Sequence, residues 1–186
     1  MIEYIEQEHL YLYNGEIIPS VTQILSIIFP NKYKGIPEHI LKNKSQYGTK
    51  IHETIEKFES EGIIEKLDYI QEASFNQYLR LKKEYKIEVI DQEQIIHYKD
   101  IYTGRYDMSA KVNGEYSLID IKTTAELDLE YLSWQLSLYD YPNEKRHDKL
   151  YALWLAKRDL GKVVEIPRKS DKEIEELLER FRNENI

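Results

Sequence analysis

The sequence predicts an α/β fold in which helices pack against a mixed β-sheet, and three observations support this fold class. Two β-rich runs flank Asn113-Gly114, which is the strongest short-range signal for a two-residue hairpin turn. Segments with the apolar spacing of helices, at 48–59 and 127–141, precede and follow this hairpin. A further apolar run at 151–156 has the length and composition of a buried strand.

The chain is expected to form a single domain. Its 186 residues suffice for one hydrophobic core, and no repeat, linker or low-complexity tract interrupts them. The expected parts of this single domain, 1–186, are an N-terminal extension at 1–46, a core at 47–166 and a C-terminal helix at 167–186.

The N-terminal part is predicted to hold a small hairpin and a short helix. Within residues 2–18, β-rich runs lie on either side of Asn14-Gly15, which again predicts a two-residue turn. Ser20 is a favourable N-cap, and Gln23 three residues later completes a capping box. Pro30 is expected to end this helix.

Residues 31–50 are basic within a chain that is acidic as a whole. Basic and aromatic residues alternate there, in a mixture that suits a nucleic-acid backbone and its bases. They are Lys32, Tyr33, Lys34, Lys42, Lys44, Tyr47 and Lys50. A solvated surface loop and helix would have the same composition, so both interpretations stay open.

The helix predicted at 48–59 carries two stripes of side chains. Ile51, Ile55 and Phe58 form the stripe expected to be buried. His52 and Glu56 lie on the neighbouring stripe, where they could bind a metal ion or form part of a solvated polar face.

The remaining elements can be placed in order from their apolar spacing and end signals. They are a helix at 71–86, a strand at 87–98 that contains Glu93, a helix at 127–141 ended by Pro142, strands at 151–156 and 163–166 joined by a turn at 159–161, and a last helix capped by Ser170 with Glu173. Gln135 and Tyr139 lie one turn apart on the helix that follows the central hairpin.

The central hairpin brings two acidic residues together. Extending the register from its turn places Asp107 opposite Asp120, with their Cβ atoms about 4.5–5.5 Å apart. Lys122 points the same way as Asp120. The opposite face is expected to be the core side, with Tyr106, Met108, Ala110, Val112, Ile119 and Ile121. Facing acids repel each other unless a positive charge lies between them.

Three explanations fit the facing acids. Arg105, expected opposite Lys122, could complete a ladder of salt bridges. The acids could also act as a general acid–base pair, as in glycosidases, although that role explains Lys122 and His52 poorly. They could instead bind Mg²⁺ or Mn²⁺, which prefer oxygen-rich ligand sets.

Composition narrows the chemistry. The chain has no cysteine, so disulfides, thiolate zinc sites and iron–sulfur clusters are not expected. A net charge of −8 is not typical of a nucleic-acid binder, although local patches matter more than totals. No apolar run reaches the ~18 residues of a membrane helix and no secretory signal opens the chain. We therefore expect no membrane contact and a cytoplasmic location.

Four segments in the right order resemble motifs of the PD-(D/E)xK nuclease superfamily and of its RecB-like branch. Asp120-Ile121-Lys122 resembles the (D/E)-x-K strand, and Gly104 to Asp107 resembles the preceding G-x-x-D strand. Gly48 with His52-Glu53 is similar to the histidine helix, and Gln135 with Tyr139 to the Q-x-x-x-Y helix. Residues 19–25 are further similar to the phage and mitochondrial genome maintenance exonucleases, which cut single-stranded DNA ends.

The resemblance implies a role for each matching position, and it implies one or two Mg²⁺ or Mn²⁺ ions, with an imidazole ligand favouring Mn²⁺. The implied metal ligands are His52, Asp107, Asp120 and the Ile121 carbonyl. Lys122 would position or activate water, and Gln135 would orient the lysine, a water or the phosphate. Supporting positions would be Glu93, Glu56, Tyr139 and Thr123, while Arg105 and the basic residues of 31–50 would contact DNA.

The resemblance thus implies a restriction-endonuclease-like core and a metal-dependent DNA nuclease, expected to be an exonuclease that prefers single-stranded ends. A duplex-DNA exonuclease, a structure-selective endonuclease and an inactive DNA-binding module with the same fold are the alternatives. Iron–sulfur relatives of this branch use cysteines that are lacking here. No helicase motif occurs either, so we expect the protein to act alone, as an oligomer, or beside a separate recombination or replication partner. The resemblance to phage proteins implies a bacterium or a phage-infected cell as its location.

Overall fold

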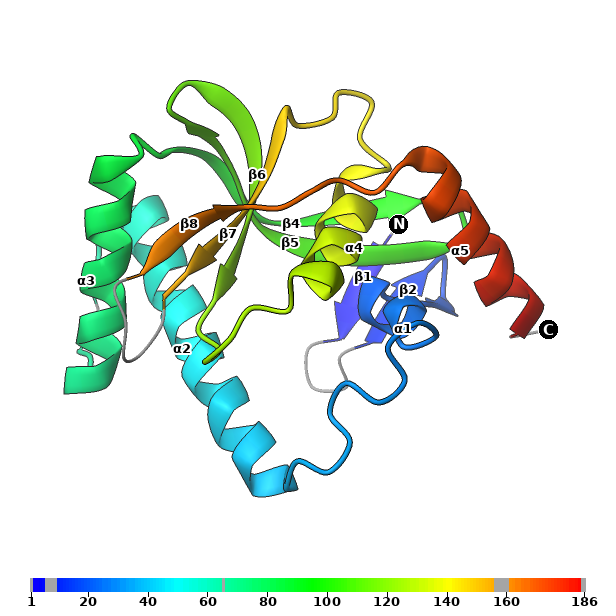
Figure 1. Ribbon diagram of the computed structural model, residues 1–186, viewed down its shortest axis with the longest axis horizontal. Coiled ribbons are helices and arrows are strands. Elements are labelled where there is room, and N and C mark those ends of the chain that lie inside the picture. The colour runs from blue at the N-terminus through cyan, green and yellow to red at the C-terminus, as the bar shows by residue number, and fades with distance from the viewer. Residues whose placement is uncertain (1, 6–9, 65, 156–160, 185–186) are drawn as a thin grey trace.

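The structure is a computed structural model that describes residues 2–5, 10–64, 66–155 and 161–184. The strands are β1 (Ile2–Ile5), β2 (Leu10–Tyr13), β3 (Glu16–Ile18), β4 (Glu88–Tyr98), β5 (Tyr102–Val112), β6 (Glu115–Lys122), β7 (Lys149–Trp154) and β8 (Lys162–Glu165). The helices are α1 (Val21–Leu25), α2 (Glu38–Glu61), α3 (Tyr69–Glu84), α4 (Leu129–Asp140) and α5 (Asp171–Glu184). Figure 1 shows a five-stranded sheet flanked by helices and a smaller N-terminal sheet, which confirms the predicted fold class.

The larger sheet has the strand order β4-β5-β6-β7-β8. Strands β4, β5 and β6 form an antiparallel meander, because tight turns connect them. Strand β7 pairs parallel to β6, and α4 forms the crossover that a parallel connection requires. Strand β8 closes the sheet in antiparallel orientation.

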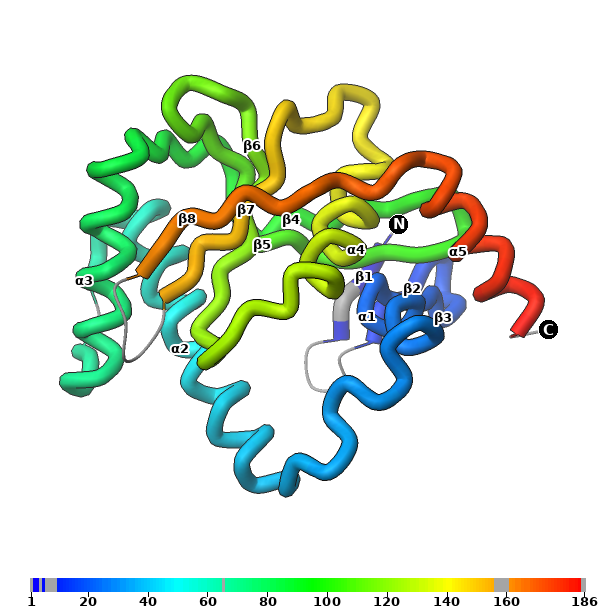
Figure 2. Tube along the Cα trace, in the orientation of Figure 1, coloured from blue at the N-terminus to red at the C-terminus, as the bar shows by residue number. Residues whose placement is uncertain are grey.

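Helices cover both faces of this sheet. One face packs against α2 and α3 through residues such as Ile55, Phe75 and Ile119. The other packs against α1, α4 and α5 through residues such as Leu118 and Leu136. The N-terminal sheet and α1 lie on the side of α5, away from α2 and α3 (Figure 2).

The expectation of a single core face is therefore wrong, and Tyr106 shows why. It packs in the cluster beneath α4, whereas Met108 two residues later packs beneath α2 and α3. In the pairing of β4 with β5, Gln92 pairs with Met108 and Gln94 pairs with Tyr106. Glu93, which lies between these two pairs on β4, has a positive φ of 50°. The register shift between β4 and β5 lies elsewhere, between Val89 and Asp91, so it does not account for the change of face at Tyr106.

Both predicted hairpin turns are confirmed. Asn113 and Gly114 have φ values of 51° and 90°, and Asn14 and Gly15 have 52° and 86°, the positive values that a type I′ turn requires. The strand pairs run from Val112–Glu115 to Met108–Ile119, in the predicted register. The N-terminal hairpin gains a third strand, β1, that was not predicted, and His9 lies outside the described residues.

The predicted helix ends are less accurate than the predicted elements. The capping box of α1 is present, with the Ser20 hydroxyl accepting from the N–H of Gln23, yet the helix ends at Leu25 rather than near Pro30. Helix α2 begins at Glu38, ten residues earlier than expected. The cap at Ser170 is confirmed, and most of the turn expected at 159–161 lies outside the described residues. No described helix combines the length and apolar character needed to cross a membrane.

Candidate metal and catalytic site

The candidate site lies where β5 and β6 separate. Their paired register ends at Met108–Ile119, while β6 continues to Lys122 paired with β7 on its other edge, with Asp120 beside Ala152. Asp107 and Asp120 are therefore not the directly facing pair that the hairpin register predicted. Instead, Oδ2 of Asp107 accepts a hydrogen bond of 2.6 Å from the backbone N–H of Ile121.

Three side chains from three different elements form a group that could hold a metal ion. His52 of α2, Glu93 of β4 and Asp107 of β5 each offer one ligand atom within 4.8 Å of the others. Nδ1 of His52 lies 3.6 Å from Oδ1 of Asp107, too far for a hydrogen bond but close enough for both atoms to bind one ion. All three side chains are half-buried.

The backbone fixes the orientation of the histidine. Nε2 of His52 lies 3.0 Å from the carbonyl oxygen of Ile121, so an N–H on Nε2 donates to that carbonyl and leaves Nδ1 as an acceptor toward Asp107. Metal-binding histidines are commonly held in this way through their second nitrogen. The Ile121 carbonyl, expected as a direct ligand, thus contacts the histidine here.

Glu93 holds the most unusual backbone position of the group. Its φ of 50° lies in the left-handed region that non-glycine residues seldom adopt. Burial raises the pKa of its carboxyl group to about 7, the charge of Asp107 adds to this, and Arg105 at 2.8 Å opposes it. A strained backbone and a perturbed carboxyl group together are typical of functional sites.

These side chains border a cavity of about 360 Å³. Its lining residues are Gly48, Thr49, His52, Glu53, Glu56, Glu93, Arg105 and Asp107. Acidic groups predominate, so the cavity suits a cation. Glu56, predicted as a supporting residue, lies in this lining, and Thr123 lies close to Gly48.

Asp120 and Lys122 form a separate ion pair beside this group. Nζ of Lys122 lies 2.9 Å and 2.7 Å from the two oxygens of Asp120, whose side chain is almost fully buried. Burial raises the pKa of Asp120 to about 6, although the charge of Lys122 opposes that shift. Burial lowers the pKa of Lys122, but the charges of Asp120 and Asp107 outweigh it and hold that pKa above its ordinary value. Lys122 is therefore a cation at neutral pH.

Helix α4 carries Gln135 and Tyr139, and Tyr139 lies near enough to Asp120 for that charge to raise its pKa. Nε2 of Gln135 lies 3.4 Å from the hydroxyl of Tyr139, and Oε1 of Gln135 is buried without a hydrogen-bond partner among the described residues. Burial raises the pKa of Tyr139, and the charges of Asp120 and Asp107 raise it further. Its hydroxyl is therefore protonated and close to both acids.

The residues predicted to contact DNA differ in their surroundings. Lys32 lies over the ring of Tyr131 and bonds to Asp128, and Tyr47 bonds to Ser74, so both side chains support packing. Lys34, Lys42 and Lys44 are exposed, and Lys50 is half-buried.

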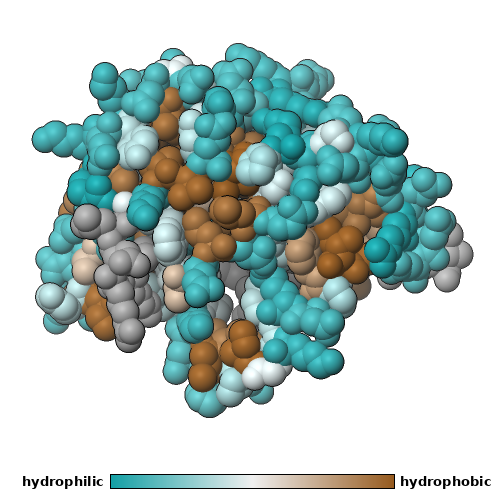
Figure 3. All heavy atoms as spheres, in the orientation of Figure 1, coloured by the Kyte–Doolittle hydropathy of each residue, from teal (hydrophilic) through white to brown (hydrophobic). Residues whose placement is uncertain are grey.

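Tyr33, by contrast, is 58% exposed and lies near enough to Lys122 to raise the lysine's pKa. The space-filling view shows a hollow between the start of α2 and the body of the molecule (Figure 3).

A second set of polar residues was not predicted. Nε2 of His147 lies 2.9 Å from the Ser109 hydroxyl, and Nδ1 lies 2.5 Å from Asp140. This order of groups matches a serine hydrolase triad, but all three side chains are buried, so no substrate reaches the serine. Arg168 also contacts Asp140, and the cluster therefore fixes α4 against β5.

Comparisons with known proteins bear on the fold only. No family model matches the chain, and no curated protein matches it. The solved structure of SSO0001 is similar in fold, with a TM-score of 0.51, 15% identity, and coverage of 94% of this chain and 76% of that one. The solved structure of a phage-related exonuclease from Haemophilus somnus 129PT aligns with 87% of this chain and with 88% of its own chain, at 12% identity. Its TM-score of 0.43 is too low to carry an argument about function.

Proposed function

We propose that the chain, as one domain, is a metal-dependent nuclease of the PD-(D/E)xK type that hydrolyses phosphodiester bonds in DNA. The observation that carries this proposal is the group His52, Glu93 and Asp107, whose ligand atoms lie within 4.8 Å of one another beside the Asp120–Lys122 ion pair. One imidazole and two carboxylates suit Mn²⁺ or Mg²⁺, and the backbone carbonyl of Ile121 already orients the imidazole.

A divalent cation held there would neutralise the clustered acids, polarise a phosphate oxygen and lower the pKa of water. The chain's own groups supply the rest. Lys122, held as a cation by Asp120, would stabilise the charge that develops on the scissile phosphate. The buried amide of Gln135 has an unused acceptor, Oε1, with which it would orient a water or the lysine.

DNA is the proposed substrate because the surface beside Lys122 offers an aromatic ring and cations. Tyr33 is exposed for stacking on a base, and Lys34 is exposed next to it. The similarity of residues 19–25 to single-strand exonucleases supports the preference for single-stranded ends.

One observation favours a second candidate, a DNA-binding module without catalysis. Asp120 lies outside the group of metal-ligand atoms and is paired with Lys122. Calorimetry distinguishes the two candidates, because the module would bind DNA without binding Mn²⁺.

The test is a cleavage assay with single-stranded and duplex DNA labelled at either end, in Mn²⁺ or Mg²⁺. We expect metal-dependent digestion of the single strand, and its loss in Lys122→Ala. Lys82→Ala is the matched control, because Lys82 is also paired with an acid but lies on α3, outside the site. Cleavage that survives Lys122→Ala at the wild-type rate would overturn the proposed role of this site.

A further inference from the structure

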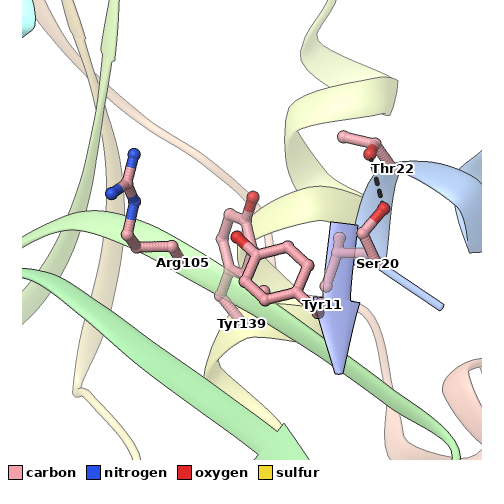
Figure 4. A pocket seen from close by; sticks show the side chains of 7 residues that line it. Tyr11, Ser20, Thr22, Arg105 and Tyr139 are labelled. Atoms are coloured by element: carbon pink, nitrogen blue, oxygen red, sulfur yellow. Dashed lines mark hydrogen bonds between the residues drawn. The ribbon is translucent and has the colours of Figure 1, made fainter. Parts of the chain in front are cut away.

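The chain on either side of helix α1 is attached to the molecule in different ways. Before the helix, the N–H of Thr103 on β5 donates to the carbonyl of Pro19 at 2.9 Å. Figure 4 shows this end of α1, where Ser20 and the rings of Tyr11 and Tyr139 line one cavity. The start of α1 is therefore held against the central sheet.

After the helix, residues 27–37 connect α1 to α2 and are attached through Lys32. Within the described residues, one side-chain hydrogen bond joins this connection to a distant part of the chain: Nζ of Lys32 donates to Oδ2 of Asp128 at 2.9 Å. Asp128 is the N-cap of α4, and its other oxygen, Oδ1, accepts from the N–H of Tyr131 at 3.0 Å. Lys32 is thus bound to a carboxylate that the backbone of α4 already holds in place.

Lys32 has a second contact with the same turn of α4. Its Nζ lies 3.3 Å from the ring centroid of Tyr131, where a cation is attracted by the electrons of the ring. The Lys32 side chain is only 20% exposed, so water screens these contacts less than it screens an ordinary surface ion pair. Together the two contacts form a tether between 27–37 and α4.

The chain that follows Lys32 projects from the molecule. Residues 33–46 are exposed apart from the half-buried Leu41, and Figure 1 shows the start of α2 away from the central sheet. The tether holds one end of this segment, the basic arm, and Tyr47, which bonds to Ser74 of α3, holds the other. The arm carries the exposed lysines that were predicted to contact DNA, Lys34, Lys42 and Lys44.

The tether also places Tyr33, the first residue of the basic arm, beside Lys122. Burial raises the pKa of Tyr131, and the nearby hydroxyl of Tyr33 adds to this. The same hydroxyl is close enough to Lys122 to act on the pKa of that lysine. The ring of Tyr33 is exposed and borders a cavity of about 380 Å³ between 29–34 and α4. A base stacked on this ring would therefore have room beside Lys122.

We infer that Lys32 is a positioning residue, which holds the basic arm against α4 so that the ring of Tyr33 stacks on a base of the strand bound at Lys122. The inference rests on the proposed function, since it takes DNA as the ligand. It replaces the direct DNA contact that composition predicted for Lys32. The two roles can be distinguished, because the tether also requires an acid, Asp128.

Asp128→Asn separates the tether from simple charge attraction. The amide oxygen can still accept from the N–H of Tyr131, so the cap is kept while the ion pair with Lys32 is lost. Removing an acid should by itself tighten DNA binding, whereas loss of the tether should weaken it. We expect the dissociation constant of a ten-thymidine oligonucleotide in metal-free buffer to rise about threefold. The control Glu126→Gln removes an exposed acid two positions earlier and should bind at least as tightly as the wild type.

The lysine variants are compared by the salt dependence of the same binding. Lys32→Met should weaken binding about tenfold, the loss of one base stack, and leave the slope of log K against log salt unchanged. Lys32→Arg keeps a cation over the ring and should bind within twofold of the wild type. The matched control Lys34→Met removes the exposed neighbouring cation and should lower the slope by about one. Tyr33→Leu should weaken binding as Lys32→Met does, and the double variant should bind no more weakly than either.

A distance measurement tests the tether without DNA. The chain has no cysteine, so Ile36→Cys and Leu129→Cys, both at exposed positions, place one spin label on the basic arm and one at the start of α4. With no further change, or with Lys32→Arg, the distribution of distances between the labels should be narrow. It should broaden when Lys32→Met or Asp128→Asn is added.

Three results would each overturn the tether: a distribution that stays narrow in Lys32→Met, a salt slope lowered by one in that variant, or binding by Asp128→Asn at least as tight as that of the wild type. A wild type that binds no oligonucleotide overturns the inference as well. Metal-dependent cleavage by the wild type, together with any of the three results, overturns the tether alone. The expected changes in distance and binding, in a protein that cleaves DNA with neither metal, overturn the nuclease and leave the tether in place.

Discussion

Asp107 lies between two parts of the site, the backbone of β6 and the imidazole of His52. Its Oδ2 accepts the backbone N–H of Ile121 at 2.6 Å, and its Oδ1 lies 3.6 Å from Nδ1 of His52. The first contact occupies a donor of β6 that β5 no longer pairs with, because the two strands have begun to separate. The second contact points into the group that could hold a metal. The Asp107 carboxylate thus satisfies a backbone donor of β6 and also belongs to the group that could hold a metal ion.

Asp107→Asn separates these two roles. The amide oxygen can still accept from Ile121, so the fold should be kept, but the negative charge is lost. We expect Mn²⁺ binding, measured by calorimetry, to weaken by more than about 100-fold, since even indirect partners of a metal contribute 10–100-fold. Asp100→Asn, in an exposed turn, is the control and should bind Mn²⁺ as the wild type does. Unchanged Mn²⁺ affinity in Asp107→Asn would contradict the proposed ligand role.

Glu93→Gly should stabilise the protein while it removes a ligand. Glycine adopts a φ of 50° without strain, so we expect the free energy of unfolding to rise by about 1 kcal/mol. Mn²⁺ binding should be lost. Lys86→Gly is the matched control, because Lys86 is exposed with a φ of 49° and lies outside the site; it should gain stability and keep Mn²⁺ binding. Urea unfolding and calorimetry test both variants, and a loss of stability in Glu93→Gly would speak against strain at this position.

Gly104→Ala and Gly48→Ala should change stability in opposite directions. A Cβ at Gly104 would lie 2.7 Å from Cε1 of Tyr139, so the ring must move, at a cost of about 1–3 kcal/mol. A Cβ at Gly48 would lie 3.4 Å from the Thr123 hydroxyl, an ordinary contact, and alanine is favoured inside a helix by about 1 kcal/mol. Thermal unfolding distinguishes the two, and equal midpoints would contradict the close approach of Tyr139 to β5.

Asp140 should make stability depend on acid pH. Burial raises its pKa, but hydrogen bonds from His147 and Arg168 outweigh this and hold it below the ordinary value. The stabilisation is therefore present above about pH 4, where the unfolded carboxyl is ionised, and is lost as pH falls through the lower folded pKa. Asp140→Asn should lower the free energy of unfolding at pH 7 by about 3–5 kcal/mol and flatten its decline between pH 4 and 2.

The control for Asp140 is Asp171→Asn. Asp171 pairs with Arg146 at the surface, where ion pairs contribute little. Urea titrations from pH 2 to 7 compare the three proteins. An acid decline in Asp140→Asn as steep as that of the wild type would rule out Asp140 as its source.

The sequence predicted what local chemistry determines. Asn113-Gly114 sets its own turn and thereby the register from Val112–Glu115 to Met108–Ile119. The cap at Ser20 depends on residues only three positions apart, and it too was predicted correctly. Such features need no knowledge of the rest of the chain.

Features that depend on distant contacts were not predictable in the same way. The turn sets the register only from its own end, so it could not show that the pairing of β5 with β6 ends at Met108–Ile119, one residue before Asp107. No periodicity predicts the positive φ of Glu93, which brings its carboxylate to His52. His147 gave no signal either, since Ser109 and Asp140 meet it only in the folded chain.

The crossover from β6 through α4 to β7 has a consequence for the order of assembly. Asp120, Lys122, Gln135 and Tyr139 all belong to this one continuous β–α segment. His52 instead meets Ile121 across 69 positions of sequence, so this contact closes a much longer loop than the crossover does, and such non-local contacts form slowly. A nascent or partly refolded chain could therefore form the aspartate–lysine pair before it can hold a cation. Metal affinity would then mark the completed molecule.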